Sequence, residues 1–172
     1  LAARGVDVAI LTNALEATDV AVVHAGYMPW RVPLLRAGVQ LYEMRREADT
    51  QAPDAKLRLG SSSAESLHAK TFVVDQRQLF VGSFNFDPRS ARLNTELGFV
   101  IDSPALAAQL DTQLREKASA RGYQLQLSPH GRLQWRDGRS EPPQLLEREP
   151  GAPLWLRLGL RLLSWLPIDW LL

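Results

Sequence analysis

Short apolar runs alternate with polar, proline-containing segments in the first part of the chain. Residues 6–11 form an aliphatic run that predicts a buried strand. Thr18-Asp19 is typical of a helix N-cap, and we expect a helix from there to residue 37 that Pro29 and Pro33 break or kink. Residues 39–44 predict the next strand. A strand, a helix and a strand in this order form the unit of a parallel sheet.

The middle of the chain favours antiparallel pairing. Residues 70–75 and 78–81 are rich in β-forming residues and are separated by Gln76-Arg77, which predicts a tight hairpin. Residues 95–101 predict another strand. Asp102-Ser103-Pro104 has the pattern of a helix start, and we expect that helix to end near residue 120. The chain is therefore predicted to be an α/β protein.

The C-terminal part has a different composition. Residues 123–127 and 132–135 predict a second hairpin, and residues 138–153 are rich in proline, glycine and charge, as in a linker. Residues 154–172 predict an amphipathic helix with Arg157 and Arg161 on one narrow face. Its apolar side suits either docking on the domain core or contact with a bilayer interface, and both interpretations stay open.

Composition limits the chemistry. The chain has 172 residues, a formal net charge of +1, three histidines and no cysteine. These values suit one domain with a real core, and they exclude disulfides, thiol catalysis and a net basic field for nucleic acid. No uncharged stretch reaches the roughly 18–20 residues that span a bilayer. Leu1, in place of methionine, leads us to expect that the chain is cut from a longer protein.

One polar constellation carries candidate chemistry. His68 and Lys70 are two residues apart, so both point the same way from an extended backbone. Ser83 and Asn85 repeat this spacing on the next run, and the hairpin would bring the two pairs together. An imidazole, an ammonium, a hydroxyl and an amide then share one site that suits a phosphate. Glu96 follows in the next predicted strand, where its carboxylate could fix the tautomer of His68.

A simpler interpretation makes His68 an edge histidine and Lys70 a solvated charge. For an isolated pair we would prefer that interpretation, but here six residue types occur at fixed spacing. The pattern resembles the signature of the phospholipase D superfamily: His68-x-Lys70-x4-Asp75-x6-Gly82-Ser83-x-Asn85. Further similarity to bacterial cardiolipin synthases, most of all to their C subgroup, covers almost the whole chain: Thr12-Asn13, Thr18-Asp19, His24 to Tyr27, Leu35 to Glu43, Phe86 to Ser90, and Asn94 to Glu96.

This resemblance implies a fold and a mechanism. The fold is a phospholipase D-like mixed sheet flanked by helices on both faces, with residues 1–137 as a catalytic half-domain. One motif histidine attacks phosphorus to form a phosphohistidine, and the other, here His68, serves as general acid and base. The resemblance implies that Lys70 and Asn85 hold phosphate oxygens with Ser83 near them. It also implies that Glu96 supports His68 and that no metal or other cofactor is required.

Other residues receive weaker assignments from the same resemblance. Asp75 belongs to the catalytic motif, although bracing its strand is the more natural role for it. His24 and Tyr27 are candidates for the headgroup pocket, and the alternative for His24 is a packed or solvated residue without chemistry. Arg89 and Asn94 follow the motif and would face an anionic headgroup, or else make surface contacts.

The implied activity is transfer of a phosphatidyl group between phospholipids. The product would be cardiolipin, made from phosphatidylglycerol and a second phospholipid such as phosphatidylethanolamine, at the cytoplasmic face of the bacterial inner membrane. Only one motif is present, so the expected partner is an N-terminal half with the other motif, or a second copy, and the isolated chain should be weakly active or inactive. A phosphodiesterase of the same superfamily and a non-catalytic half-domain are the alternatives, and the net charge disfavours nucleic acid as substrate.

Overall fold

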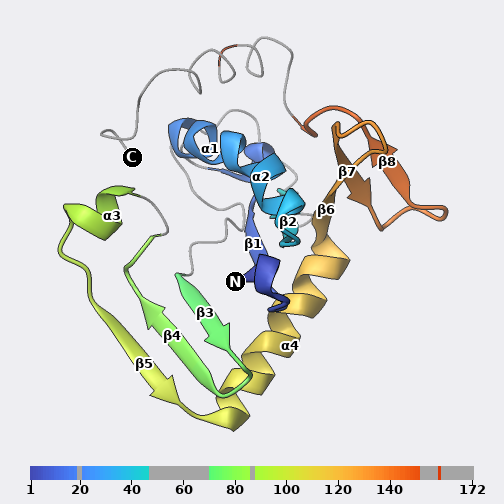
Figure 1. Cartoon of the computed structure of the whole chain (residues 1–172). Helices are drawn as coiled ribbons and strands as arrows, with labels where there is room; N and C mark the ends of the chain where they lie inside the picture. The colour runs from blue at the N-terminus through green and yellow to red at the C-terminus, as the bar shows by residue number, and fades with distance from the viewer. Residues whose placement is uncertain (19–20, 47–69, 86–87, 152–158, 160–172) are drawn as a thin grey trace, which may run out of the picture.

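Two β-sheets and a long helix organise the part of the chain that the computed structural model describes, residues 1–18, 21–46, 70–85, 88–151 and 159. One sheet has five strands in the order β1-β2-β6-β7-β8, and the other has three strands in the order β3-β4-β5 (Figure 1). The five-stranded sheet is mixed, because β1 and β2 are parallel and its other pairs are antiparallel. The α/β class is confirmed, with the strands divided between two sheets.

The first sheet begins with the predicted parallel unit, β1 (Ala9–Asn13) and β2 (Gln40–Met44). β1 starts later than the apolar run suggested and includes Thr12 and Asn13. The reason is its register with β2, which pairs Ala9 with Gln40 and Asn13 with Met44. Hydrogen bonding to the neighbouring strand, rather than apolarity, therefore sets the ends of β1.

The helix between these strands is interrupted as the prolines predicted. α1 (Ala21–Tyr27) is followed by a 3₁₀ turn, η3 (Met28–Trp30), and then by α2 (Arg31–Arg36). Pro29 lies in the 3₁₀ turn, and Pro33 lies in the first turn of α2. Backbone N–H groups in a first helical turn have no intrahelical partner, so proline is tolerated there. Two further 3₁₀ turns are η1 (Ala2–Arg4) and η2 (Leu15–Ala17).

The predicted hairpin forms β3 (Thr71–Val74) and β4 (Gln78–Gly82) of the second sheet. Asp75 and Gln76 both have positive φ, 50° and 52°, and the Arg77 N–H donates to the Val74 carbonyl at 3.0 Å. Because Val74 pairs with Gln78, the turn contains three residues, 75–77, one more than the two residues that the sequence predicted. β5 (Gly98–Asp102) pairs with β4 along its length, so the predicted third strand is also present but begins three residues later.

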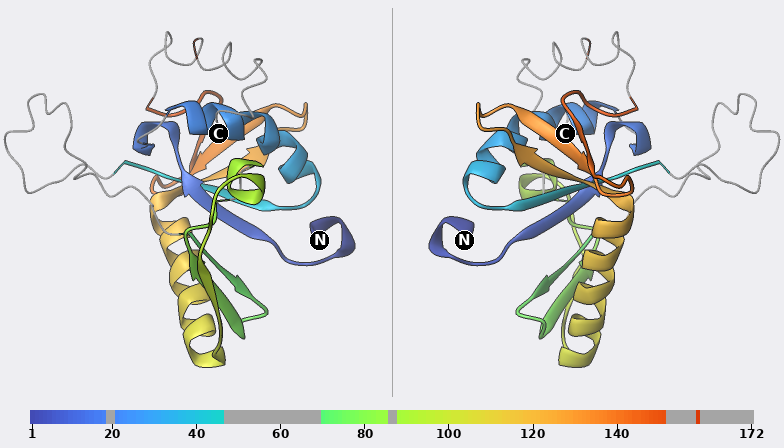
Figure 2. Two further views of the ribbon diagram at one scale, coloured as in Figure 1. Left: turned by 90° about the vertical axis from the view of Figure 1, so that its left-hand side faces the viewer. Right: turned by 90° about the vertical axis from the view of Figure 1, so that its right-hand side faces the viewer.

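The long helix α4 (Pro104–Arg121) links the two sheets. The Leu106 N–H donates to Ser103 Oγ at 3.5 Å, and Pro104 occupies the first turn, as the helix start predicted. Figure 2 shows α1 and α2 above the five-stranded sheet and α4 extending below it, beside the three-stranded sheet. A short helix, α3 (Pro88–Arg92), lies between β4 and β5.

The core lies between α2 and the five-stranded sheet. After α4 the chain forms the predicted second hairpin, β6 (Gly122–Leu127) and β7 (Leu133–Asp137). Leu34 and Leu35 of α2 pack against buried side chains that this hairpin shares with β2 and its neighbours: Ala14, Val39, Leu41, Tyr123, Leu125 and Trp135. This packing fixes the side of the sheet on which α1 and α2 lie.

The interval 138–153 is not only a linker, which corrects the prediction from its composition. It contains β8 (Gln144–Leu146), which pairs with β7 so that Leu146 lies opposite Trp135. Leu146 packs on the core, and Glu149 is buried. These contacts with β7 and the core stabilise a strand in this segment despite its proline and glycine content. Apart from Gly159, the predicted helix 154–172 lies outside the described residues. In the described part, no helix has the length and apolarity to cross a bilayer.

Candidate active site

The β3–β4 hairpin brings two parts of the motif to one end. Lys70 directly precedes β3, and its carbonyl accepts a hydrogen bond from the Gly82 N–H at 3.1 Å. Ser83 follows β4 and is therefore next to Lys70 across the hairpin. Lys70 is half-buried and Ser83 is exposed. Lys70 is thus opposite Gly82, so this lysine and this serine lie at the same end of the hairpin, while the shared face expected from the sequence spacing stays a prediction.

Ser83 bonds to Glu96 through its side chain and to Leu97 through both its side chain and its backbone. Ser83 Oγ donates to Glu96 Oε2 at 2.5 Å, and the Leu97 N–H donates to Ser83 Oγ at 3.0 Å. The Ser83 N–H donates to the Leu97 carbonyl at 2.8 Å. These bonds fix the loop after β4 to the segment that enters β5. The serine therefore positions the carboxylate of Glu96 beside the lysine end of the hairpin.

Glu96 is stabilised in its ionised form. Hydrogen bonds from Ser83, Ser90 and Asn94, together with the charge of Lys70, lower the pKa of its carboxyl group. The Asn94 amide donates to Glu96 Oε1 at 3.3 Å. A carboxylate held in this way can accept a hydrogen bond from a ring N–H, which is the role expected for it toward His68. His68 lies outside the described residues, so that contact stays a prediction.

Two other motif residues are exposed or only partly described. Asn85 is exposed in the loop after β4. Arg89 belongs to α3, but its side chain is not among those described. The structure therefore gathers Lys70, Ser83, Asn94 and Glu96 in one place, while the roles proposed for Asn85 and Arg89 toward substrate stay predictions.

Asp75 does not join this group. It lies in the turn of the β3–β4 hairpin, at the end opposite Lys70 (Figure 1). Five residues of extended chain correspond to about 16 Å at about 3.3 Å per residue. This separation does not place the carboxylate of Asp75 beside the lysine. Asp75 is exposed in the turn and not part of the strand, so the bracing role expected for it stays a prediction.

His24 lies in a different environment, a buried ionic cluster. Its side chain comes from α1, and its Nε2 atom is 2.7 Å from both Glu149 Oε1 and Arg31 Nη2. Arg31 Nη2 donates to the same Glu149 oxygen at 2.5 Å. His24 is 4% exposed. The packed alternative therefore describes His24 in this structure, and its role toward a headgroup stays a prediction that the burial does not favour.

The cluster continues from Arg31 into the five-stranded sheet. Arg31 Nε donates to Glu43 Oε1 at 2.8 Å, and Trp135 Nε1 donates to Glu43 Oε2 at 2.8 Å. The guanidinium also lies 5.1 Å from the ring centre of Tyr27, the other headgroup candidate. Burial is the main cause that raises the pKa of Tyr27. Sequence reasoning missed Arg31, Glu43 and Glu149. One available signal was Glu43 in an apolar strand, two residues from Leu41 and so on the same face.

The ionisation of Glu149 predicts that the contribution of this cluster to folding stability depends on pH. Burial alone would raise its pKa, but the hydrogen bonds and charges of His24 and Arg31 outweigh burial and lower it to about 2. An unfolded glutamate titrates near pH 4.3. The stabilisation is therefore complete above that pH and is lost as pH falls from about 4 to about 2.

We expect Glu149→Gln to lower the melting temperature at pH 6 and to flatten its decline between pH 4 and 2. Asp137, whose pKa Arg45 lowers to about 2, should supply the decline that persists. Thermal unfolding followed by circular dichroism from pH 6 to pH 2 measures both effects. Glu116→Gln, at an exposed position on α4, serves as the control. An unchanged slope in Glu149→Gln would contradict the prediction.

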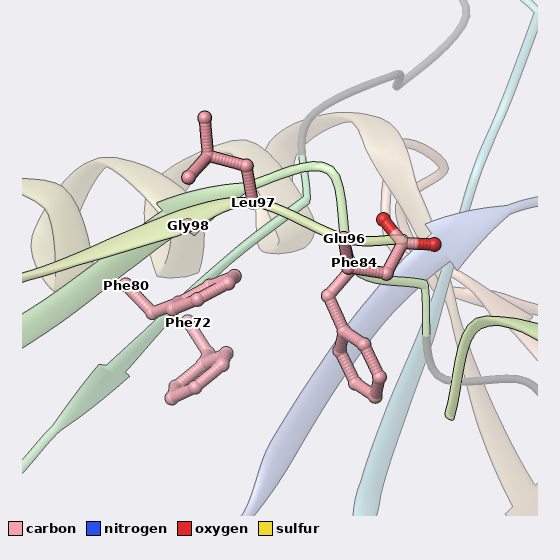
Figure 3. Close-up of a pocket in the computed structure, with 6 residues that line it drawn as sticks. All are labelled: Phe72, Phe80, Phe84, Glu96, Leu97 and Gly98. Carbon is pink, nitrogen blue, oxygen red and sulfur yellow. The ribbon is translucent and has the colours of Figure 1, made fainter. Parts of the chain in front are cut away.

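An aromatic hollow lies beside Glu96. It has a volume of about 390 Å³ and is lined by Phe72, Phe80, Phe84, Glu96, Leu97 and Gly98 (Figure 3). The rings of Phe72 and Phe80 are stacked, with centres 4.8 Å apart and planes 11° apart. Among the side chains that the structure describes, no group of three histidine, aspartate or glutamate residues could hold a metal ion.

Comparison with known proteins identifies a matching family and similar relatives. The model of the family described as "Cardiolipin synthase, PLD-like domain" matches residues 1–118. The chain is 47% identical over 169 residues to cardiolipin synthase C of Escherichia coli, a match that covers 98% of this chain and 36% of the relative. It is 30% identical over 161 residues to cardiolipin synthase A of Yersinia pseudotuberculosis, covering 94% of this chain and 25% of the relative.

A solved structure is also similar. It is that of Nuc, a phospholipase D family member from Salmonella typhimurium, with 20% identity and a TM-score of 0.44. The match covers 70% of this chain and 65% of that one. The chain therefore spans about a quarter to a third of the length of the cardiolipin synthases that it matches.

Proposed function

Because the chain belongs to the cardiolipin synthase family of phospholipase D-like domains, we propose that it forms one half of a phosphatidyl-transfer site. The observation that carries the proposal is the grouping of Lys70, Ser83 and Glu96 at one end of the β3–β4 hairpin, two residues from His68. The lysine ammonium would neutralise the phosphate, and the ionised Glu96 would hold the imidazole of His68. Asn85 would add a donor to the phosphate.

The proposed reaction has two steps. A histidine nitrogen of the partner motif attacks phosphorus, the bond from phosphorus to the leaving alcohol oxygen breaks, and His68 gives that alcohol a proton. The acceptor alcohol then returns a proton to His68 and attacks phosphorus, which breaks the phosphorus–nitrogen bond and restores the first histidine. The acceptor alcohol is the free glycerol hydroxyl of phosphatidylglycerol, because phosphatidylethanolamine has no headgroup hydroxyl. The phosphatidyl donor is a second phospholipid, either another phosphatidylglycerol or phosphatidylethanolamine, and its glycerol or ethanolamine leaves.

The proposal includes a partner and a location. The partner motif is supplied by an N-terminal half of a longer protein or by a second copy of this chain. Phospholipid substrates place the site at a membrane surface, and we propose a peripheral position on the cytoplasmic face of the bacterial inner membrane. The single motif in this chain supports the need for a partner.

Lipid product analysis tests this function. This chain would replace the matching part of E. coli cardiolipin synthase C, and the chimera would be incubated with phosphatidylglycerol vesicles, with and without phosphatidylethanolamine. Mass spectrometry should detect cardiolipin, and His68→Ala should abolish it. His130→Ala, at an exposed histidine in the β6–β7 turn, should leave the product unchanged.

Other products would select the alternatives. Phosphatidic acid without cardiolipin would indicate a hydrolase, in which water takes the place of the acceptor alcohol. Nicking of a supercoiled plasmid added to the same preparation would indicate a nuclease. Cardiolipin formation that survives His68→Ala would indicate a half-domain without a catalytic role.

A further inference from the structure

The strand β5 leaves large apolar side chains in contact with solvent. Phe99 is 64% exposed and Val100 is 69% exposed, and Leu97, directly before the strand, is 69% exposed. Successive residues of a strand point to opposite faces, so Phe99 and Val100 expose both faces of the sheet. A soluble domain seldom leaves such a contiguous apolar surface uncovered, and a patch of this kind marks an interaction site.

The exposed surface extends from β5 across the three-stranded sheet. On one face, Val81 lies opposite Phe99 and is exposed, while Leu79 on the same face is buried where α4 contacts β3 and β4. On the other face, Val100 lies opposite Phe80, whose ring stacks on Phe72. The helix α4 therefore covers only part of one face.

The second face has two glycines beside the Phe80 ring. Gly82 and Gly98 lie opposite each other on β4 and β5, and a side chain at either position would collide with the Phe80 ring. The Phe80 ring and Gly98 both line the aromatic hollow (Figure 3). Glycine in a strand interior often marks a place where another group approaches closely. Here the group that approaches is the Phe80 ring, which these glycines allow to lie on the face of the sheet.

The outer edge of β5 points to the kind of partner. In the described part of the chain, β5 has β4 as its neighbour on one side and no strand on the other. Its outward N–H and C=O groups are a template for another strand. Lipid hydrocarbon offers these groups no hydrogen bonds, and open sheet edges do not face lipid. A partner that covers both the edge and the faces must be polypeptide.

We propose that β5 and its sheet dock a segment of the longer polypeptide outside these 172 residues, which adds a strand to the β5 edge and covers the Phe72–Phe80 face. The inference rests on the apolar surface and on family membership, and it is independent of the reaction proposed above. The match with the 47% identical relative covers 36% of that relative, so a protein of the same length would have further polypeptide to form this segment. The candidate half-site and its sheet are then completed by one covalently linked partner.

Hydrogen exchange compares the isolated chain with the chimera in E. coli cardiolipin synthase C. In the chimera, those amides of residues 98–102 that point away from β4 should exchange about 100-fold more slowly than in the isolated chain. Equal exchange in the two proteins would overturn the proposal. If exchange of these amides in the isolated chain becomes slower as its concentration is raised, the surface would be assigned to a second copy. Slow exchange that requires phosphatidylglycerol vesicles would assign it to lipid.

A charged substitution gives an independent test. Val100→Glu should lower the melting temperature of the chimera by several degrees and leave that of the isolated chain unchanged, because Val100 is exposed there. Leu106→Glu, at an exposed leucine on α4, should change neither protein. If the Val100→Glu chimera does not fold, Val100→Thr keeps the shape and repeats the comparison. Slow exchange of β5 in a chimera that makes no cardiolipin would retain this proposal and reject the proposed function.

Discussion

Replacing Arg31 by methionine should lower the free energy of unfolding by about 3–5 kcal/mol, the usual result of breaking a buried ion pair from one side. The guanidinium contacts two buried carboxylates, Glu43 at 2.8 Å and Glu149 at 2.5 Å. Methionine fills similar space but leaves Glu43 without its cation and leaves Glu149 with His24 alone. Urea unfolding of the isolated chain, followed by circular dichroism, measures the loss.

A matched variant separates burial from charge. Arg115 also contacts two carboxylates, Asp7 and Asp111, but its side chain is 46% exposed. Arg115→Met should cost less than about 1 kcal/mol, because surface ion pairs contribute little. Arg31→Lys should fall between the two, since lysine keeps the charge but loses the planar fork and its stacking on Tyr27 and Trp135. Equal costs for the Arg31→Met and Arg115→Met variants would refute the argument.

Lys70→Met should reduce cardiolipin formation by the chimera at least about 100-fold, as removal of a single anion-stabilising donor does in other enzymes. Lys70 lies at the end of the hairpin where Ser83 holds Glu96, and its charge contributes to the lowered pKa of that carboxyl group. The loss should appear in turnover at saturating phosphatidylglycerol. The measurement is the initial rate of cardiolipin formation by mass spectrometry.

The control for Lys70 is another cation on the same hairpin. Arg77 follows the turn at the far end, and its side chain is 69% exposed. Arg77→Met removes the same formal charge at a position remote from Ser83 and Glu96, so the rate should stay within about twofold of the parent chimera. A Lys70→Met chimera that keeps more than a tenth of the parent rate would show that the ammonium is not part of the reacting site.

Local signals allowed much of the fold to be predicted. The β3–β4 hairpin follows from two β-rich runs with a short polar turn between them, and the broken α1–α2 segment follows from Pro29. The placement of Lys70 and Ser83 at the same end of the hairpin follows from that pairing of strands. In each case the deciding interactions lie within a few residues along the chain, so the sequence pattern contains them.

Long-range interactions could not be predicted in the same way. Arginine and glutamate usually lie on the surface. The burial of Arg31 and Glu149 depends on their contact with each other across 118 positions of the sequence. The strand β8 was hidden in a segment of linker composition, because its stability comes from β7 and the core beneath it. The separation of the strands into two sheets likewise depends on pairing partners rather than on local pattern.

The position of Glu149 also has a consequence for synthesis on the ribosome. Arg31 leaves the ribosome 118 residues before the carboxylate that it contacts. At about 5–20 residues per second, this interval lasts roughly 6–24 s. During that time α1 and α2 cover a sheet that still lacks β6, β7 and β8, with His24 and Arg31 open to water. The N-terminal helices therefore reach their final packing only when nearly the whole described chain has been made.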